Sequence, residues 1–128
     1  MATKYVDVNG YAVNYFHTGQ TTLPAVVPDT NKGRLLLYVH GAGSNGHFAH
    51  KMMDIFAGSQ SPISFDFPGH GRSSGTESLK SVQAYSDFTY AFWKALALRP
   101  VVVVGHSMGG AIAMDLALRY SDMVEALV

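Results

Sequence analysis

The sequence lacks cysteine and is poor in charge, and both shortages limit what the protein can be. Without cysteine it can form neither a disulfide framework nor a thiolate metal site. Only 14% of its 128 residues are charged, and the formal net charge is zero with no basic run. This balance disfavours nucleic acid and anionic membranes as partners.

Long hydrophobic runs are absent as well. No stretch approaches the ~18 apolar residues that are needed to span a bilayer. The N-terminus, MATKYVDVNG, has no apolar segment after Lys4 and so does not resemble a signal peptide. We therefore expect no membrane span and a cytoplasmic location.

Hydrophobic residues make up 48% of a chain that is long enough for one domain. The β-prone residues 4–8 and 11–16 flank Asn9-Gly10, a pair that favours a tight hairpin turn. Short apolar strands and helices then alternate, which predicts an α/β protein. Its sheet should be mostly parallel, be flanked by helices and start with the antiparallel hairpin. The later strands are expected at 34–39, 62–67, 101–104 and from 124, and the helices at about 47–56, 79–98 and 108–120.

The segment Gly105-His106-Ser107-Met108-Gly109 matches G-x-S-x-G between a VVVV strand and an alanine-rich helix. In that setting the pattern is typical of a nucleophile elbow, whose strained serine projects its hydroxyl from a sharp strand-to-helix turn. Glycine at 105 and 109 removes side chains that would collide with the strand and the helix. The helix N-terminus would direct the Met108 N–H at the reacting centre. A glycine-rich turn that merely packs tightly is the simpler alternative.

A second glycine-rich segment, residues 41–46 (GAGSNG), allows a different interpretation. It matches G-x-G-x-x-G after a buried strand, and Asp66 lies about twenty residues further on, as in dinucleotide-binding folds. Three features count against this alternative. A hairpin and a long loop precede the strand, His40 stands directly before the first glycine, and the segment 105–110 is left unexplained.

Taken together, the segments LLLYVHGAGSNG, DFPGHGRS and VVVVGHSMGG resemble the α/β-hydrolase superfamily, in the order in which that superfamily carries them. The resemblance covers essentially the whole chain. It implies that Ser107 is the nucleophile and that the N–H groups of Ala42 and Met108 form the oxyanion hole. It also implies that His40 shapes the oxyanion loop and is not the catalytic base. The expected supporting residues of the loop and the elbow are His40, Gly41, Gly43, Gly105, His106 and Gly109.

A serine at the elbow is typical of the esterases, lipases, thioesterases, carbon–carbon bond hydrolases and perhydrolases among these proteins. We therefore expect cleavage of a small-molecule carboxylic ester through an acyl-enzyme, with no metal or cofactor. A carbon–carbon bond hydrolase or a perhydrolase of the same fold is an alternative. A non-hydrolytic receptor or scaffold is another, from a different class.

The chain departs from this family in the segment after Ser107. Such proteins carry the acid and the histidine of the triad beyond the serine, whereas only residues 108–128 remain here. For the histidines that are present, including His70 and His17, a solvent-facing or core role is expected. We therefore expect residues 1–128 to be the N-terminal part of one core domain, without its cap and C-terminal strands. Such a fragment would need the remainder of its chain, or a companion segment, to be active.

Overall fold

The computed structural model describes residues 2–20, 23 and 27–128, and within them the chain forms one six-stranded sheet. The strand order across the sheet is β1-β2-β4-β3-β5-β6. The first two strands are antiparallel, and the other four run parallel to one another. This confirms the predicted α/β class. The strands are β1 (Ala2–Val8), β2 (Tyr11–His17), β3 (Leu35–Val39), β4 (Ser61–Phe65), β5 (Val101–Gly105) and β6 (Val124–Leu127).

The hairpin turns at the predicted dipeptide. Asn9 and Gly10 have φ angles of 52° and 85°. Positive φ at both central residues is what a type I′ turn requires, and Asn-Gly accepts it with the least strain. Val8 pairs with Tyr11 next to this turn, and the pairing continues without a shift to Ala2 and His17 at the far end of the hairpin. Local turn chemistry therefore sets the register of the first two strands.

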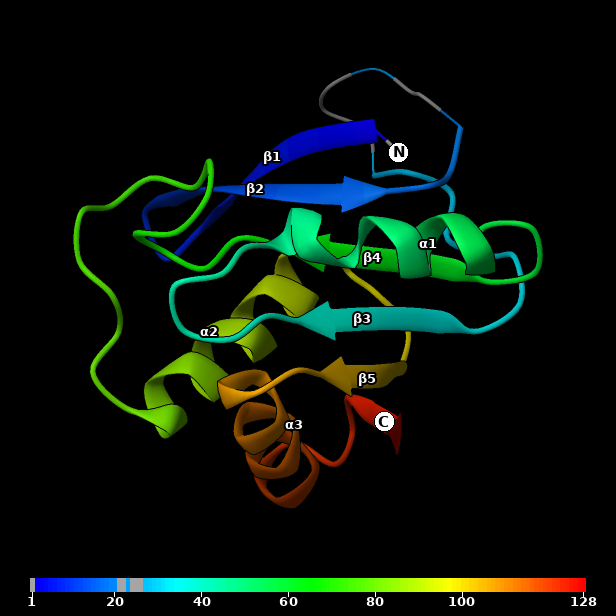
Figure 1. Ribbon diagram of the computed structural model, residues 1–128. Coiled ribbons are helices and arrows are strands. Elements are labelled where there is room, and N and C mark those ends of the chain that lie inside the picture. The colour runs from blue at the N-terminus through cyan, green and yellow to red at the C-terminus, as the bar shows by residue number, and fades with distance from the viewer. Residues whose placement is uncertain (1, 21–22, 24–26) are drawn as a thin grey trace.

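Helices cover both faces of the sheet (Figure 1). On one face, the 3-10 helix η1 (Gly46–Ala49) and α1 (His50–Phe56) pack against Phe16 and Tyr38. On the other face, α2 (Val82–Ala95) and α3 (Met108–Arg119) cover the larger core. Alternate residues of β3 point to opposite faces, so that strand is buried along its whole length. A strand that is buried on both faces has apolar residues at successive positions, which explains the continuous apolar run in the sequence.

The second predicted helix is too long at both ends. The observed helix begins after Ser81, whose side chain accepts the N–H of Ala84 at 3.0 Å. It ends before Ala97, which has a φ of 51° and whose N–H donates to the Lys94 carbonyl at 2.9 Å. A helix normally ends in this way at glycine. Because alanine occupies the position, the periodic pattern gives no sign of the end.

The parallel strands bring three loops to one edge of the sheet. Tyr38 pairs with Ser64, and Val39 pairs with Gly105, so β3, β4 and β5 end side by side. The chain leaves these strands at residues 40, 66 and 106. The glycine loop, the DFPGHGRS stretch and the elbow are therefore neighbours, although the sequence separates them by up to 66 residues.

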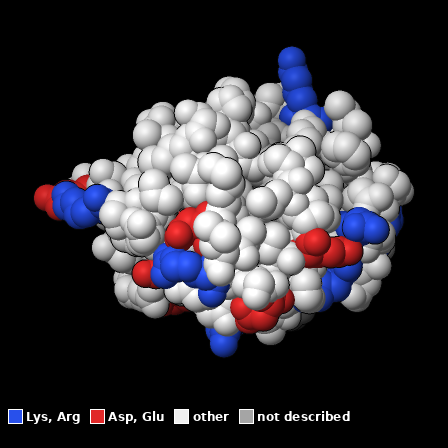
Figure 2. Space-filling model, turned by 90° about the horizontal axis from the view of Figure 1, so that it is seen from below, with Lys and Arg blue, Asp and Glu red and all other residues white. Residues whose placement is uncertain are grey.

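The face of the molecule shown in Figure 2 carries positive and negative groups close together rather than a broad patch of one sign. Several charged side chains of the molecule form ion pairs. Arg34 lies 3.0 Å from Glu125, and Arg119 lies 2.9 Å from Asp87 and 2.7 Å from Asp115. Exposed pairs of this kind contribute little to stability.

Candidate active site

Ser107 occupies a strained backbone conformation at the junction of β5 and α3. Its φ is 58° and its ψ is −122°. A side chain other than glycine rarely adopts positive φ, and such strain gathers at functional sites. The residue is exposed, and its hydroxyl does not cap the helix that it precedes. The side chain is thus exposed and is not used to cap α3.

Glycines on either side of Ser107 make this turn possible. A Cβ atom at Gly105 would overlap the carbonyl oxygen of Gly109. A Cβ atom at Gly109 would overlap the carbonyl oxygen of Val39, at the end of β3. Helix α3 can therefore start directly against the sheet only because these two side chains are missing.

The glycine loop lies against the elbow. A Cβ atom on Gly41 would stand 3.1 Å from the Cβ of Ser107 and 3.6 Å from the backbone nitrogen of Met108. The N–H of His106 donates to the Val39 carbonyl at 3.2 Å, which ties the elbow to the strand that precedes the loop. The two predicted segments are therefore brought together at one place.

Two backbone N–H groups beside Ser107 are available to a ligand. Met108 is the first residue of α3, and the first N–H groups of a helix have no partner within it. Ala42 is exposed, and within the described part of the chain its N–H makes no hydrogen bond. Unpaired donors of this kind can stabilise negative charge that develops on a bound oxygen.

His40 is buried and joins two loops. Its Nδ1 lies 2.7 Å from the carbonyl oxygen of Gly41, and its Nε2 lies 3.1 Å from the backbone nitrogen of Phe67. A carbonyl can only accept and an N–H can only donate, so Nδ1 carries the proton and the ring is neutral. Burial lowers the pKa of His40 below its usual value, against the opposing effect of its hydrogen bond to Gly41. Its nitrogens are thus occupied by backbone, away from Ser107.

His106 and Phe48 form an aromatic pair next to the elbow. Their ring centroids are 5.3 Å apart, with an interplanar angle of 28°. Phe48 comes from η1 and is 61% exposed. This exposed aromatic pair includes the residue that directly precedes Ser107. Sequence reasoning did not single out Phe48, because a lone aromatic residue at the start of a helix has no pattern to distinguish it.

Asp66 is a structural residue and not a ligand for a ribose. It is 1% exposed. Its carboxylate accepts the N–H of Gly46 at 2.7 Å, the N–H of Arg72 at 2.9 Å and the side-chain amide of Asn14 at 3.0 Å. The carboxylate that the dinucleotide interpretation requires is therefore already engaged in hydrogen bonds within the protein, which argues against that alternative.

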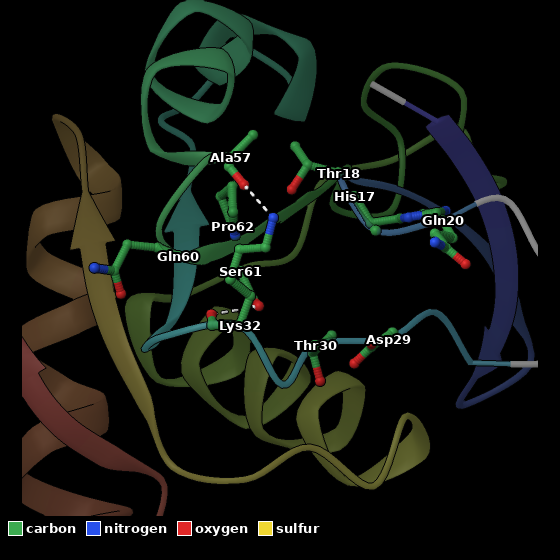
Figure 3. Close-up of a pocket in the computed structure, with 11 residues that line it drawn as sticks. His17, Thr18, Gln20, Asp29, Thr30, Lys32, Ala57, Gln60, Ser61 and Pro62 are labelled. Atoms are coloured by element: carbon green, nitrogen blue, oxygen red, sulfur yellow. Dashed lines mark hydrogen bonds between the residues drawn. The ribbon is translucent and has the colours of Figure 1, made fainter.

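Figure 3 shows a polar hollow of about 240 Å³. It lies at the end of the sheet where β4 begins, opposite the end that carries the elbow. It is formed where β2 ends, β4 begins and α1 ends, together with residues 29–32. It includes His17, which is 1% exposed and whose ring nitrogens have no hydrogen-bond partner among the residues that the structure describes. Because the parallel strands separate this hollow from Ser107, it belongs to no part of the candidate active site.

Membrane spans and metal clusters are both absent from the residues that the structure describes. None of the helices formed by those residues is both long and apolar enough to cross a membrane. The same residues contain no group of three or more His, Asp or Glu side chains placed to hold a metal ion. The cytoplasmic location and the exclusion of nucleic acid stay predictions.

Comparison with known proteins identifies the family. A model of the alpha/beta hydrolase fold matches residues 34–128, and the chain belongs to this family. It is 37% identical over 87 residues to the magnesium-chelatase 30 kDa subunit of Rhodobacter capsulatus, covering 67% of this chain and 31% of that protein. It is 27% identical over 119 residues to the (E)-2-((N-methylformamido)methylene)succinate hydrolase of Acinetobacter baylyi, covering 93% and 41%.

Comparison with solved structures gives a similar result. The structure of Est816, described as an N-acyl homoserine lactone degrading enzyme, matches with a TM-score of 0.78 and 28% identity. The match covers 96% of this chain and 43% of that one. The chain thus spans less than half the length of each of these three proteins.

Proposed function

We propose that the protein containing this chain is a serine hydrolase that cleaves carboxylic esters through an acyl-enzyme intermediate. The observation that carries the proposal is the backbone of Ser107, strained at φ 58° and exposed between β5 and α3. Strain has a cost of about 1–3 kcal/mol, and it persists where the position of a reacting group depends on it. A turn that served packing alone would place glycine there.

Each residue of the site has one role in the proposed reaction. Ser107 Oγ attacks the ester carbonyl carbon and passes its proton to a base. The N–H groups of Ala42 and Met108 stabilise the oxyanion that forms. Collapse of the tetrahedral intermediate breaks the bond to the alcohol, which leaves with the proton. Water then attacks the acyl-enzyme, which releases the carboxylic acid and restores the serine hydroxyl.

The base and its acid are proposed to lie outside residues 1–128. His40, the buried histidine nearest the glycine loop, has both nitrogens bound to backbone. His106 stacks on Phe48. We therefore propose that these 128 residues form the N-terminal part of one core domain. This agrees with the 31–43% of the compared proteins that the chain covers.

The substrate class is inferred from the chemistry of the site and from two of the compared proteins. One is named as a hydrolase and the other as a lactone-degrading enzyme, and a lactone is a cyclic ester. A carbon–carbon bond hydrolase would use the same serine and oxyanion donors. Turnover of p-nitrophenyl acetate without turnover of a diketone of similar size distinguishes the ester hydrolase from that alternative.

Active-site labelling tests the proposal. The full-length protein is treated with a fluorophosphonate, and the adduct is located by intact mass and peptide mapping. A single adduct on the Ser107 peptide is expected, absent from Ser107→Ala and present in Ser121→Ala, which removes an exposed serine elsewhere. A folded full-length protein that leaves Ser107 unlabelled contradicts the proposal.

A non-hydrolytic role is the second candidate, and one observation favours it. The relative with 37% identity is named as a magnesium-chelatase subunit, and that name denotes no hydrolase. The labelling experiment separates the two candidates, because a scaffold has no need of an activated serine.

A further inference from the structure

His70 repeats the bonding pattern of His40 in the opposite direction. Its Nδ1 lies 3.0 Å from the carbonyl oxygen of Pro68, in its own loop, and its Nε2 lies 3.3 Å from the backbone nitrogen of Gly43, in the glycine loop. The partners again require a proton on Nδ1 and a lone pair on Nε2. The two rings lie side by side, with centroids 5.1 Å apart. Each histidine donates to its own loop and accepts from the other.

The two histidines hold the two peptide groups that flank Ala42. The carbonyl of Gly41 accepts from His40, and it shares a planar trans peptide with the N–H of Ala42. In such a peptide the N–H points away from the carbonyl, so His40 sets the direction of the Ala42 N–H. The next peptide contains the N–H of Gly43, which His70 holds.

The turn is also closed by the N–H of Ser44, which donates to the Gly41 carbonyl at 3.2 Å, but that bond does not involve the second peptide. Gly43 is exposed and has a φ of 70°, and a Cβ atom placed on it would meet nothing within 4 Å. Packing therefore does not hold the residue in place, and glycine permits rotation that other residues resist. The hydrogen bond to His70 connects Gly43 to the DFPGHGRS stretch. Without that bond the peptide between Ala42 and Gly43 can rotate, although the Ser44 N–H still closes the turn around it.

We propose that His70 is a positioning residue for the oxyanion donor of Ala42, because it holds the peptide that links Ala42 to Gly43 and so limits rotation within the turn. The inference rests on the proposed function, since a positioned donor matters only when an oxyanion forms. His70 itself touches neither Ser107 nor the oxyanion in this role. It acts through the backbone of the loop.

Three substitutions of His70 separate its two hydrogen bonds. His70→Gln places an oxygen near the position of Nε2 and can still accept from Gly43. His70→Asn keeps a donor near Nδ1 for Pro68 but does not reach Gly43. His70→Phe keeps the ring and loses both bonds. His50→Asn, on α1, is the matched control for replacing a histidine.

Kinetics of p-nitrophenyl acetate hydrolysis by the full-length protein give the first readout. We expect His70→Asn and His70→Phe to lower kcat about 10–100-fold, somewhat less than the loss of an oxyanion donor outright. KM should stay within about threefold, because the ground state does not need the donor. His70→Gln and His50→Asn should keep kcat within about threefold of the wild type.

Amide hydrogen exchange at Gly43 gives a second readout, which needs no activity. Exchange should be faster in His70→Asn and His70→Phe and unchanged in His70→Gln. The proposal is overturned if the Asn and Phe variants keep full kcat, or if Gln loses as much as Asn. A wild type that neither hydrolyses the ester nor reacts with the fluorophosphonate overturns the proposed function instead. Positioning for catalysis then fails with it, whatever the exchange at Gly43 shows.

Discussion

The carboxylate of Asp66 accepts the backbone N–H of Gly46 at 2.7 Å, so a side chain just past the end of β4 holds the loop that leaves β3. The same carboxylate accepts the N–H of Arg72, at the far end of the DFPGHGRS stretch. One buried acid thus joins two loops that leave neighbouring strands at the same edge of the sheet. The contact shows why an acid is needed there without any role in binding a nucleotide.

Replacing Asp66 by Asn should destabilise the protein. The amide has one accepting oxygen where the carboxylate has two, and its NH₂ group would face at least one of the buried donors. We expect the free energy of unfolding to fall by about 1–3 kcal/mol, measured by urea denaturation. Asp54→Asn removes an exposed carboxylate on α1 and should change it by less than about 0.5 kcal/mol. Equal stability of Asp66→Asn and the wild type would show that the three bonds contribute nothing.

The two adjacent glycines at the start of α3 should respond oppositely to alanine. A Cβ atom at Gly109 would overlap the Val39 carbonyl oxygen, so Gly109→Ala forces α3 away from the sheet and should lower stability by about 1–3 kcal/mol. At Gly110 the nearest atom would be the Gly105 carbonyl oxygen at 3.9 Å. Gly110→Ala should therefore gain up to about 1 kcal/mol from helix propensity. Thermal unfolding of both variants tests the pair, and similar changes in Tm would contradict the argument.

Acid should destabilise the fold through two buried histidines. Burial lowers the pKa of His40 and of His17, and the charge of Lys4 adds to the effect at His17. The unfolded chain therefore binds more protons than the folded one once the pH falls below about 6.5. Stability is full above that pH and is lost as the pH falls toward the lowered pKa values. Urea denaturation between pH 7.5 and 5.5 should show a slope of up to about 1.4 kcal/mol per pH unit for each histidine. Rising stability as the pH falls over this range would contradict the assignment.

Local chemistry explains which parts of the fold could be predicted. Asn9-Gly10 predicts its turn because a type I′ turn requires positive φ at both central positions and this pair tolerates it. The continuous apolar runs predict buried parallel strands. The end of α2, just before Ala97, could not be predicted, because alanine has no local preference for the left-handed backbone that Ala97 adopts. Helix boundaries of this kind depend on tertiary packing.

Some parts of the candidate site could likewise be predicted from the sequence, and others could not. Ser107 and its glycines stand in a contiguous pattern, so sequence alone identifies them. The pairing of His70 with Gly43 joins residues 27 positions apart, and it depends on β3 and β4 ending at the same edge of the sheet. A histidine in the DFPGHGRS stretch could approach the site, but the sequence offers no means to find its partner. A separation of 20 positions likewise hid the contact between Asp66 and Gly46.

His17 offers a case in which removing a polar group should not harm the fold. Both of its ring nitrogens are buried, and no residue in the described part of the chain bonds to them, so their desolvation is not compensated there. Phenylalanine has a similar shape, and the adjoining hollow of about 240 Å³ leaves room for it. His17→Phe should therefore keep or raise Tm, as replacement of uncompensated polar groups by apolar ones does. It should also reduce the acid slope to that of His40.

Asn14 provides the matched comparison, because it lies in the same strand and is equally buried. Its side chain donates to Asp66 at 3.0 Å, so Asn14→Leu leaves a buried carboxylate short of a donor. That variant should lose about 1–3 kcal/mol of unfolding free energy. If His17→Phe proves as destabilising as Asn14→Leu, then the nitrogens of His17 do form bonds in the protein, and the hollow beside them is where the partner must be sought.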